Sequence, residues 1–271
     1  LVDSNLINAT DYESYFTKIY FDAKVELKKM QIKDEEKMEK DLVKDDNESN
    51  ASAMDYDGYN SDLENYSILL IPFYDKKKNV QMFFERMLQS RDPGIRLNTT
   101  ILMLRNKIPV ADSLLMNLAT DDQYRSRLYV QLEKIKRLDK FPVKFKNQPD
   151  IARSFLLADK NYDKVDSVVF IKKEPAAYLD KKGVVYFYKY RVKKEDDWKM
   201  GISGLQSADE KVILTDDKLT TMTDKKIKKD EPLEQQFKDQ LKKRLFSFHP
   251  SAKNFYGYNN YSDYTAIDNY E

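Results

Sequence analysis

The spacing of apolar residues changes once along the chain, and this change limits the possible folds more than any other feature. Up to about residue 145, apolar side chains recur at steps of three and four residues, as on the buried face of an amphipathic helix. Beyond residue 164 they instead occupy alternate positions, which is typical of strands with one buried face. The two patterns predict an α+β protein, with helices in residues 1–145 and a small antiparallel sheet in residues 146–271.

The helical part begins with a long predicted helix at residues 10–44. Thr10 and Glu13 have the spacing of a capping box at its start. Its apolar stripe thins after Met30, where charged residues take over. A segment near residues 45–63, rich in small and polar residues, is predicted to be a linker.

One stretch of this linker resembles the calcium-binding loop of EF-hand proteins. Gly58 fits the sixth position of that loop, where a sharp turn requires glycine. The residues that then stand at oxygen-ligand positions are Asp55, Asp57 and Glu64. Ala53 stands at the first position, where the loop has aspartate. The resemblance implies calcium as a ligand, and the alternative is a polar loop in which Asp and Gly form turns.

Two helical hairpins are predicted between residues 80 and 138. In the first, an apolar helix leads to a turn at Asp92 and then to a second apolar helix. In the second, a helix that opens at Pro109 leads to a turn at Asp121 and to another apolar helix. The two turns carry the same residue types at the same offset. The matched pairs are Asp92 with Asp121, Ile95 with Tyr124 and Arg96 with Arg125.

With this match, residues 80–138 resemble a pair of HEAT-type repeats, whose second helix opens with Asp, Pro, any residue, an aliphatic residue and Arg. The resemblance implies that the aspartate and the arginine brace neighbouring turns, and an aspartate at a helix start is also a common cap. Both roles are structural. A solenoid needs about three repeats to be stable, so we expect other segments to cover the exposed faces of these two.

The second part of the chain is predicted to form an antiparallel meander of at least three strands. The three predicted strands are at residues 165–171, 183–192 and 198–202. A connection rich in lysine and aspartate follows at residues 206–230, and Pro232 then opens a helix that is expected to cover the sheet. The tail, residues 254–270, is rich in tyrosine and asparagine.

A row of tyrosine and valine side chains shares one face of the middle predicted strand. Its members are Val184, Tyr186, Tyr188, Tyr190 and Val192. Tyrosine rings beside Lys189 and Arg191 suit stacking on a sugar or a base, so glycan binding is one hypothesis. The interpretation that we favour is that this face packs on a helix, because a covered sheet needs one apolar face.

Composition argues against several classes of function. The 47 basic residues offset 46 acidic ones, so the net charge favours no nucleic-acid partner. Cysteine is absent, and His249 is the only histidine, so no catalytic triad or zinc site is indicated. The longest apolar run, residues 68–73, is far shorter than the roughly 20 residues of a transmembrane helix. No catalytic residue is predicted, although a hydrolase with unrecognised acidic residues stays an alternative.

Residues 186–206, YFYKYRVKKEDDWKMGISGLQ, are similar to the accessory region that follows the catalytic part of long bacterial TraB/GumN-type proteins. The resemblance implies a non-catalytic region of an exported envelope protein, in the periplasm or cell envelope. The start at Leu1, without methionine or a signal sequence, also led us to expect a processed chain or an excerpt. We therefore expect a non-enzymatic protein-interaction or scaffolding module with a protein partner. A calcium- or glycan-binding domain is the alternative, and the oligomeric state is open.

Overall fold

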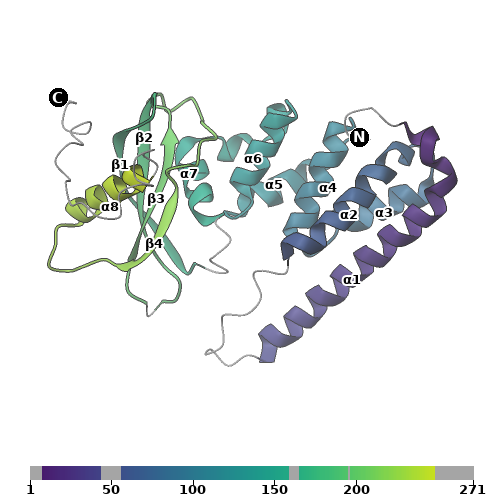
Figure 1. The fold of residues 1–271 in the computed structure, drawn as a ribbon, viewed down its shortest axis with the longest axis horizontal. Coiled ribbons are helices and arrows are strands. Elements are labelled where there is room, and N and C mark those ends of the chain that lie inside the picture. Colours follow the sequence, from purple (N-terminus) through teal and green to yellow (C-terminus); the bar gives the residue numbers. More distant parts are fainter. Residues whose placement is uncertain (1–7, 44–55, 159–164, 195, 248–271) are drawn as a thin grey trace. The chain divides into compact units, whose positions relative to one another are not determined.

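The computed structural model describes most of the chain. The described residues are 8–43, 56–158, 165–194 and 196–247. They form a series of helices, a four-stranded antiparallel sheet and a final helix, which confirms the predicted α+β class (Figure 1). Two compact units can be distinguished: residues 1–118 with 131–140, and residues 119–130 with 141–271. That residues 1–145 and 146–271 form separate regions stays a prediction.

The elements follow the chain in a simple order. The helices before the sheet are α1 Phe16–Val43, α2 Tyr56–Leu70, α3 Lys78–Leu88, α4 Pro93–Arg105, α5 Asp112–Thr120, α6 Arg125–Lys134 and α7 Gln148–Leu157. Short 3-10 helices occupy Ala9–Tyr15, Ile71–Phe73, Leu138–Lys140 and Val143–Phe145. The strands are β1 Ser167–Tyr178, β2 Lys181–Arg191, β3 Lys199–Gln206 and β4 Thr221–Lys226, and α8 Leu233–Ser247 follows them.

The long first helix is present, but its start differs from the prediction. A 3-10 helix precedes α1, and the backbone N–H of Asn8 donates a hydrogen bond of 2.8 Å to the carboxylate of Asp11. The predicted capping box of Thr10 and Glu13 was therefore wrong. Asn8 and Asp11 have the same three-residue spacing, so the pattern was real but was placed two residues too late.

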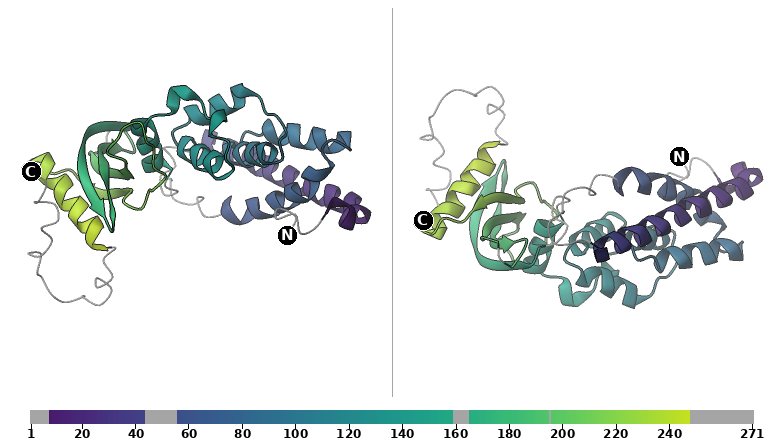
Figure 2. Two further views of the ribbon diagram at one scale, coloured as in Figure 1. Left: turned by 90° about the horizontal axis from the view of Figure 1, so that it is seen from above. Right: turned by 90° about the horizontal axis from the view of Figure 1, so that it is seen from below.

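The core of the first unit is formed by α1, α2, α3 and α4. Helix α1 runs beside α2 (Figure 2), and Phe16 at its start contacts Phe73, with 5.1 Å between the ring centroids. Helix α2 was not predicted from the sequence, because it begins at Tyr56 within the segment expected to be a linker. Its first turns are polar and contain glycine, and its packing comes from Leu63 and Leu70, both buried in the core.

The two predicted helical hairpins are confirmed as α3–α4 and α5–α6. In α3, Val80, Phe83, Phe84 and Met87 are buried and Leu88 is half-buried, and the turn before α4 lies at the predicted aspartate. Helix α5 begins at Asp112, three residues after the predicted Pro109. The positions of these helix starts show that the apolar periodicity predicted the elements well and their ends less well.

The sheet has the strand order β1-β2-β3-β4, and all neighbouring strands are antiparallel. The predicted meander of at least three strands is thus confirmed, and β4 is its fourth strand. Strand β4 lies in residues 206–230, which were predicted to be a connection only. Its sequence, TMTDKK, does not show the apolar alternation that predicts a strand. An edge strand with an exposed end can form without it.

Helices cover both faces of this sheet. On one face α8 packs on β2, with 4.9 Å between the ring centroids of Phe187 and Phe237. On the other face α7 packs on β3, where a Cβ atom added to Gly201 would lie 2.8 Å from Leu156. Figures 1 and 2 show the sheet between these two helices. The helix α8 was predicted as a cover, but α7, which follows its N-cap Asn147 and has Pro149 in its first turn, was not predicted from the sequence.

Candidate functional site

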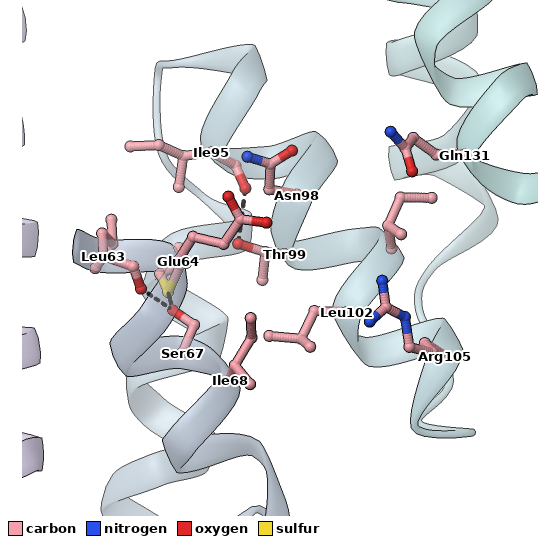
Figure 3. Close-up of a pocket in the computed structure, with 12 residues that line it drawn as sticks. Leu63, Glu64, Ser67, Ile68, Ile95, Asn98, Thr99, Leu102, Arg105 and Gln131 are labelled. Atoms are coloured by element: carbon pink, nitrogen blue, oxygen red, sulfur yellow. Dashed lines mark hydrogen bonds between the residues drawn. The ribbon is translucent and has the colours of Figure 1, made fainter. Parts of the chain in front are cut away.

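A pocket lies between α2 and α4 in the first unit, with Gln131 of α6 at its edge (Figure 3). Its volume is about 130 Å³. The buried side chains that form its floor include Leu63, Ser67, Met87, Ile95, Thr99 and Leu102. Its rim carries Glu64, Asn98 and Arg105, which are all exposed. The pocket therefore has a largely apolar floor and a polar, charged rim.

The two hydroxyl groups on the floor form hydrogen bonds within the protein. Ser67 donates to the carbonyl of Leu63 at 2.6 Å and lies 3.6 Å from the sulfur of Met87. Thr99 donates to the carbonyl of Ile95 at 2.7 Å. These i to i−4 bonds satisfy buried hydroxyls on a helix. The short side chains of Ser67 and Thr99 therefore help to shape the floor of the pocket, and both hydroxyls are bonded to backbone carbonyls.

The size of the pocket limits what it can hold. Sites for small molecules usually enclose about 300 to 1,000 Å³, whereas an apolar cavity of about 150 Å³ holds a molecule as small as benzene. A volume of about 130 Å³ thus suits one side chain of medium size. Glu64 is the only carboxylate among the described residues that line the pocket. The pair of close carboxylates that a hydrolase of the predicted kind requires is therefore not found here.

The turn before α4 uses the aspartate and the arginine that the sequence analysis singled out. Asp92 caps α4 by accepting a hydrogen bond of 2.6 Å from the backbone N–H of Gly94. Arg96 donates to the backbone carbonyls of Ser90 at 2.6 Å and Arg91 at 2.8 Å. The arginine thus ties the start of α4 to the turn that follows α3.

The turn before α6 repeats these bonds at the same offsets. Asp121 accepts a hydrogen bond of 2.9 Å from the backbone N–H of Gln123. Arg125 donates to the carbonyls of Ala119 at 2.6 Å and Thr120 at 3.2 Å, the last two residues of α5. Relative to each arginine, the acceptors again lie six and five residues earlier in the chain. The match seen in the sequence therefore corresponds to a match in local structure.

The second arginine has further partners. Arg125 forms an ion pair with Asp122 at 2.7 Å, and its guanidinium lies 4.6 Å from the ring centroid of Phe145. It also donates to the carbonyl of Asp150 on α7 at 3.2 Å. Only 4% of the residue is exposed. Asp122 in turn pairs with Arg153 at 2.9 Å, so this turn is the centre of a small ionic network.

The residues predicted to bind calcium are only partly described. Asp55 lies outside the described residues, Asp57 lies in the first turn of α2, and Glu64 lies further along the same helix on the rim of the pocket. Seven residues of helix separate the last two by about 10 Å along the axis. In the part of the chain that the structure describes, no three acidic or histidine side chains are grouped as metal ligands. The calcium site stays a prediction.

The tyrosine row on β2 lies beneath α7. Tyr186 and Tyr188 are at most 2% exposed. The hydroxyl of Tyr186 donates to the side-chain oxygen of Gln148 at 3.0 Å, and that of Tyr188 donates to the carbonyl of Pro149 at 3.3 Å. Burial raises the pKa of Tyr188 far above its usual value. Because these rings are covered, they are not available for a glycan or a base to stack on in this structure.

Sequence reasoning missed the half of the pocket that α2 supplies. The signal was present in LENYSILL, residues 63–70, where Leu63, Ser67 and Leu70 follow at steps of four and three residues. The polar residues that precede Leu63 made the segment resemble a linker, so this spacing was not recognised as a helix. His249 and the tyrosine-rich tail at residues 254–270 lie outside the described residues. None of the helices in the described ranges is both long enough and apolar enough to span a membrane.

Comparison of the chain with protein-family models, with curated proteins and with solved structures finds no match. The resemblances to HEAT-type repeats and to TraB/GumN-type proteins are therefore not tested by a relative.

Proposed function

We propose that this chain is a non-enzymatic protein-interaction module, and that the pocket between α2 and α4 receives one apolar side chain of a protein partner. The observation that carries this proposal is the pocket itself, with its apolar floor, polar rim and volume of about 130 Å³. Protein interfaces are built in this way, with a buried anchor in a pocket and a polar rim that excludes water.

The covered sheet and the bonded hydroxyls of the pocket also support this proposal. Both faces of the sheet are covered by helices, so the tyrosine row has no space for a ligand. The floor hydroxyls of the pocket are bonded to backbone carbonyls, and its lining supplies no pair of acidic groups for hydrolysis. A binding function without chemistry thus explains the pocket with the fewest additional assumptions.

The repeated turns support a scaffold of the HEAT type as part of this proposal. Each hairpin has an aspartate cap and an arginine that binds carbonyls of the preceding turn. Helical repeats of this kind commonly present a surface for a partner. The similarity of residues 186–206 to TraB/GumN-type accessory regions supports the further proposal that the chain belongs to a bacterial envelope protein. Calcium binding remains the alternative, and titration of the chain with calcium followed by thermal unfolding tests it.

The interaction can be tested by selecting binders from a random peptide display library on the whole chain. Asn98→Trp places a large side chain on the exposed rim and should close the pocket, so selected peptides should lose binding. Met82→Trp is the matched control, because Met82 is also an exposed helical residue of the same unit but does not line the pocket. Peptides that bind the wild-type chain and the Asn98→Trp variant equally well would contradict the proposal.

A further inference from the structure

The rim of the pocket carries two opposite charges. Glu64 projects from α2 toward the Asn98 end of the pocket, and Arg105 lies toward the Gln131 end (Figure 3). Both side chains are exposed. Glu64 forms no ion pair with any residue that the structure describes. The guanidinium of Arg105 has five donors, so it can bind a partner carboxylate in addition to any contact within the chain.

The separation of the two charges sets the length of the segment that can meet both. Asn98 and Arg105 are seven residues apart on α4, which corresponds to about 10 Å along the helix axis. An extended chain rises about 3.3 Å per residue, and residues two apart lie on the same face. Three side chains at alternate positions of an extended segment therefore span about 13 Å, slightly more than the separation of Asn98 and Arg105 along α4.

The small size of this pocket favours an extended segment over a helix. A docked amphipathic helix usually presents several apolar anchors at steps of three and four residues, and each of them needs its own space. The volume of about 130 Å³ holds one anchor. In an extended segment, one anchor with two flanking charges on the same face is sufficient.

We propose that the partner segment is an extended peptide in which one apolar residue is flanked, two positions away on either side, by a basic residue and an acidic residue. The apolar side chain enters the pocket, the basic residue pairs with Glu64 and the acidic residue pairs with Arg105. This inference rests on the proposed protein-interaction function and adds the charge pattern of the partner. Exposed ion pairs contribute little affinity individually, so their main effect is on selectivity.

The test uses a peptide display library with a fixed leucine and random residues on both sides. On the wild-type chain, peptides with one basic and one acidic flank should be enriched about fivefold over peptides with two flanks of the same sign. Glu64→Lys makes both ends of the rim basic and should shift the selection to two acidic flanks. Arg105→Glu makes both ends acidic and should shift it to two basic flanks. Chain direction does not affect these outcomes, because a mixed peptide can bind in either direction.

Two results would overturn the proposal, and they can be told apart. In the first, the wild-type chain, Glu64→Lys and Arg105→Glu all select the same flanking charges, while Asn98→Trp still abolishes selection. The proposed charge pattern is then wrong, but the pocket does bind a side chain. If Asn98→Trp leaves the selection unchanged, the binding function of the pocket is wrong as well. Thermal unfolding of the variants checks that each one is folded before selection.

Discussion

The turns before α4 and α6 have the same local bonds in different surroundings. In both, an aspartate accepts a hydrogen bond from a backbone N–H two residues later, and an arginine binds carbonyls six and five residues earlier. Arg96 is half-buried, and its hydrogen bonds to the carbonyls of Ser90 and Arg91 lie within its own turn. Arg125 is buried and also contacts Asp122, Phe145 and Asp150.

This difference shows what a short sequence pattern can and cannot determine. The aspartate and the arginine are close in sequence to the groups that they bind, so the pattern alone is sufficient to form the turn. How much each arginine contributes to the free energy of unfolding depends on residues outside the pattern. Polar groups that lose a partner in a buried site are left without a hydrogen bond, whereas those in an exposed site bind water. The following substitutions separate the two contributions.

The largest effect is expected from Arg125→Ala. The change removes the bonds to three carbonyls and the ion pair with Asp122, and it leaves space beside Phe145. We expect the free energy of unfolding to fall by about 3 kcal/mol. Urea unfolding followed by circular dichroism measures this value. A loss no greater than that of Arg96→Ala would mean that the buried surroundings add nothing.

Arg125→Lys should have an intermediate effect. Lysine keeps the charge that Asp122 pairs with but lacks the planar group that reaches several carbonyls at once. We expect a loss of about 2 kcal/mol in the same unfolding experiment. If lysine restores the stability completely, charge alone is responsible and the fork geometry of the arginine is unimportant.

A smaller loss is expected from Arg96→Ala. The carbonyls of Ser90 and Arg91 lose a donor, but water can replace it because the side chain is only half-buried. We expect a loss of about 1 kcal/mol. The difference between this loss and that of Arg125→Ala measures what the buried surroundings of Arg125 add to stability. Equal melting temperatures for the two variants would contradict such a contribution.

The smallest effect is expected from Asp92→Ser. One carboxylate oxygen of Asp92 caps α4, while the other is buried without a hydrogen-bond partner in the described structure. Serine keeps a capping acceptor and removes the unpartnered oxygen, so the free energy of unfolding should change by less than about 0.5 kcal/mol. Asp92→Ala removes the cap as well and should cost about 1 kcal/mol. Equal losses for serine and alanine would show that the cap contributes nothing.

The sequence by itself determined the features that depend on neighbouring residues. Apolar periodicity predicted the α+β class, the two hairpins and α8, and the spacing of Asp92 and Arg96 predicted a turn that the structure contains. The alternation in residues 183–192 predicted β2 and its tyrosine face. In each case the groups that form the bonds or the pattern lie within a few residues, so local spacing carries the information.

Only the tertiary structure decided what covers each surface. Helix α2 begins in a polar segment and owes its packing to Leu63 and Leu70, and the short helix α7 covers the tyrosine row that could otherwise have bound a ligand. The pocket combines side chains of α2 and α4 that are far apart in the sequence. Burial depends on which distant elements meet, and a single sequence specifies that outcome through the packing of the whole chain instead of through any local pattern.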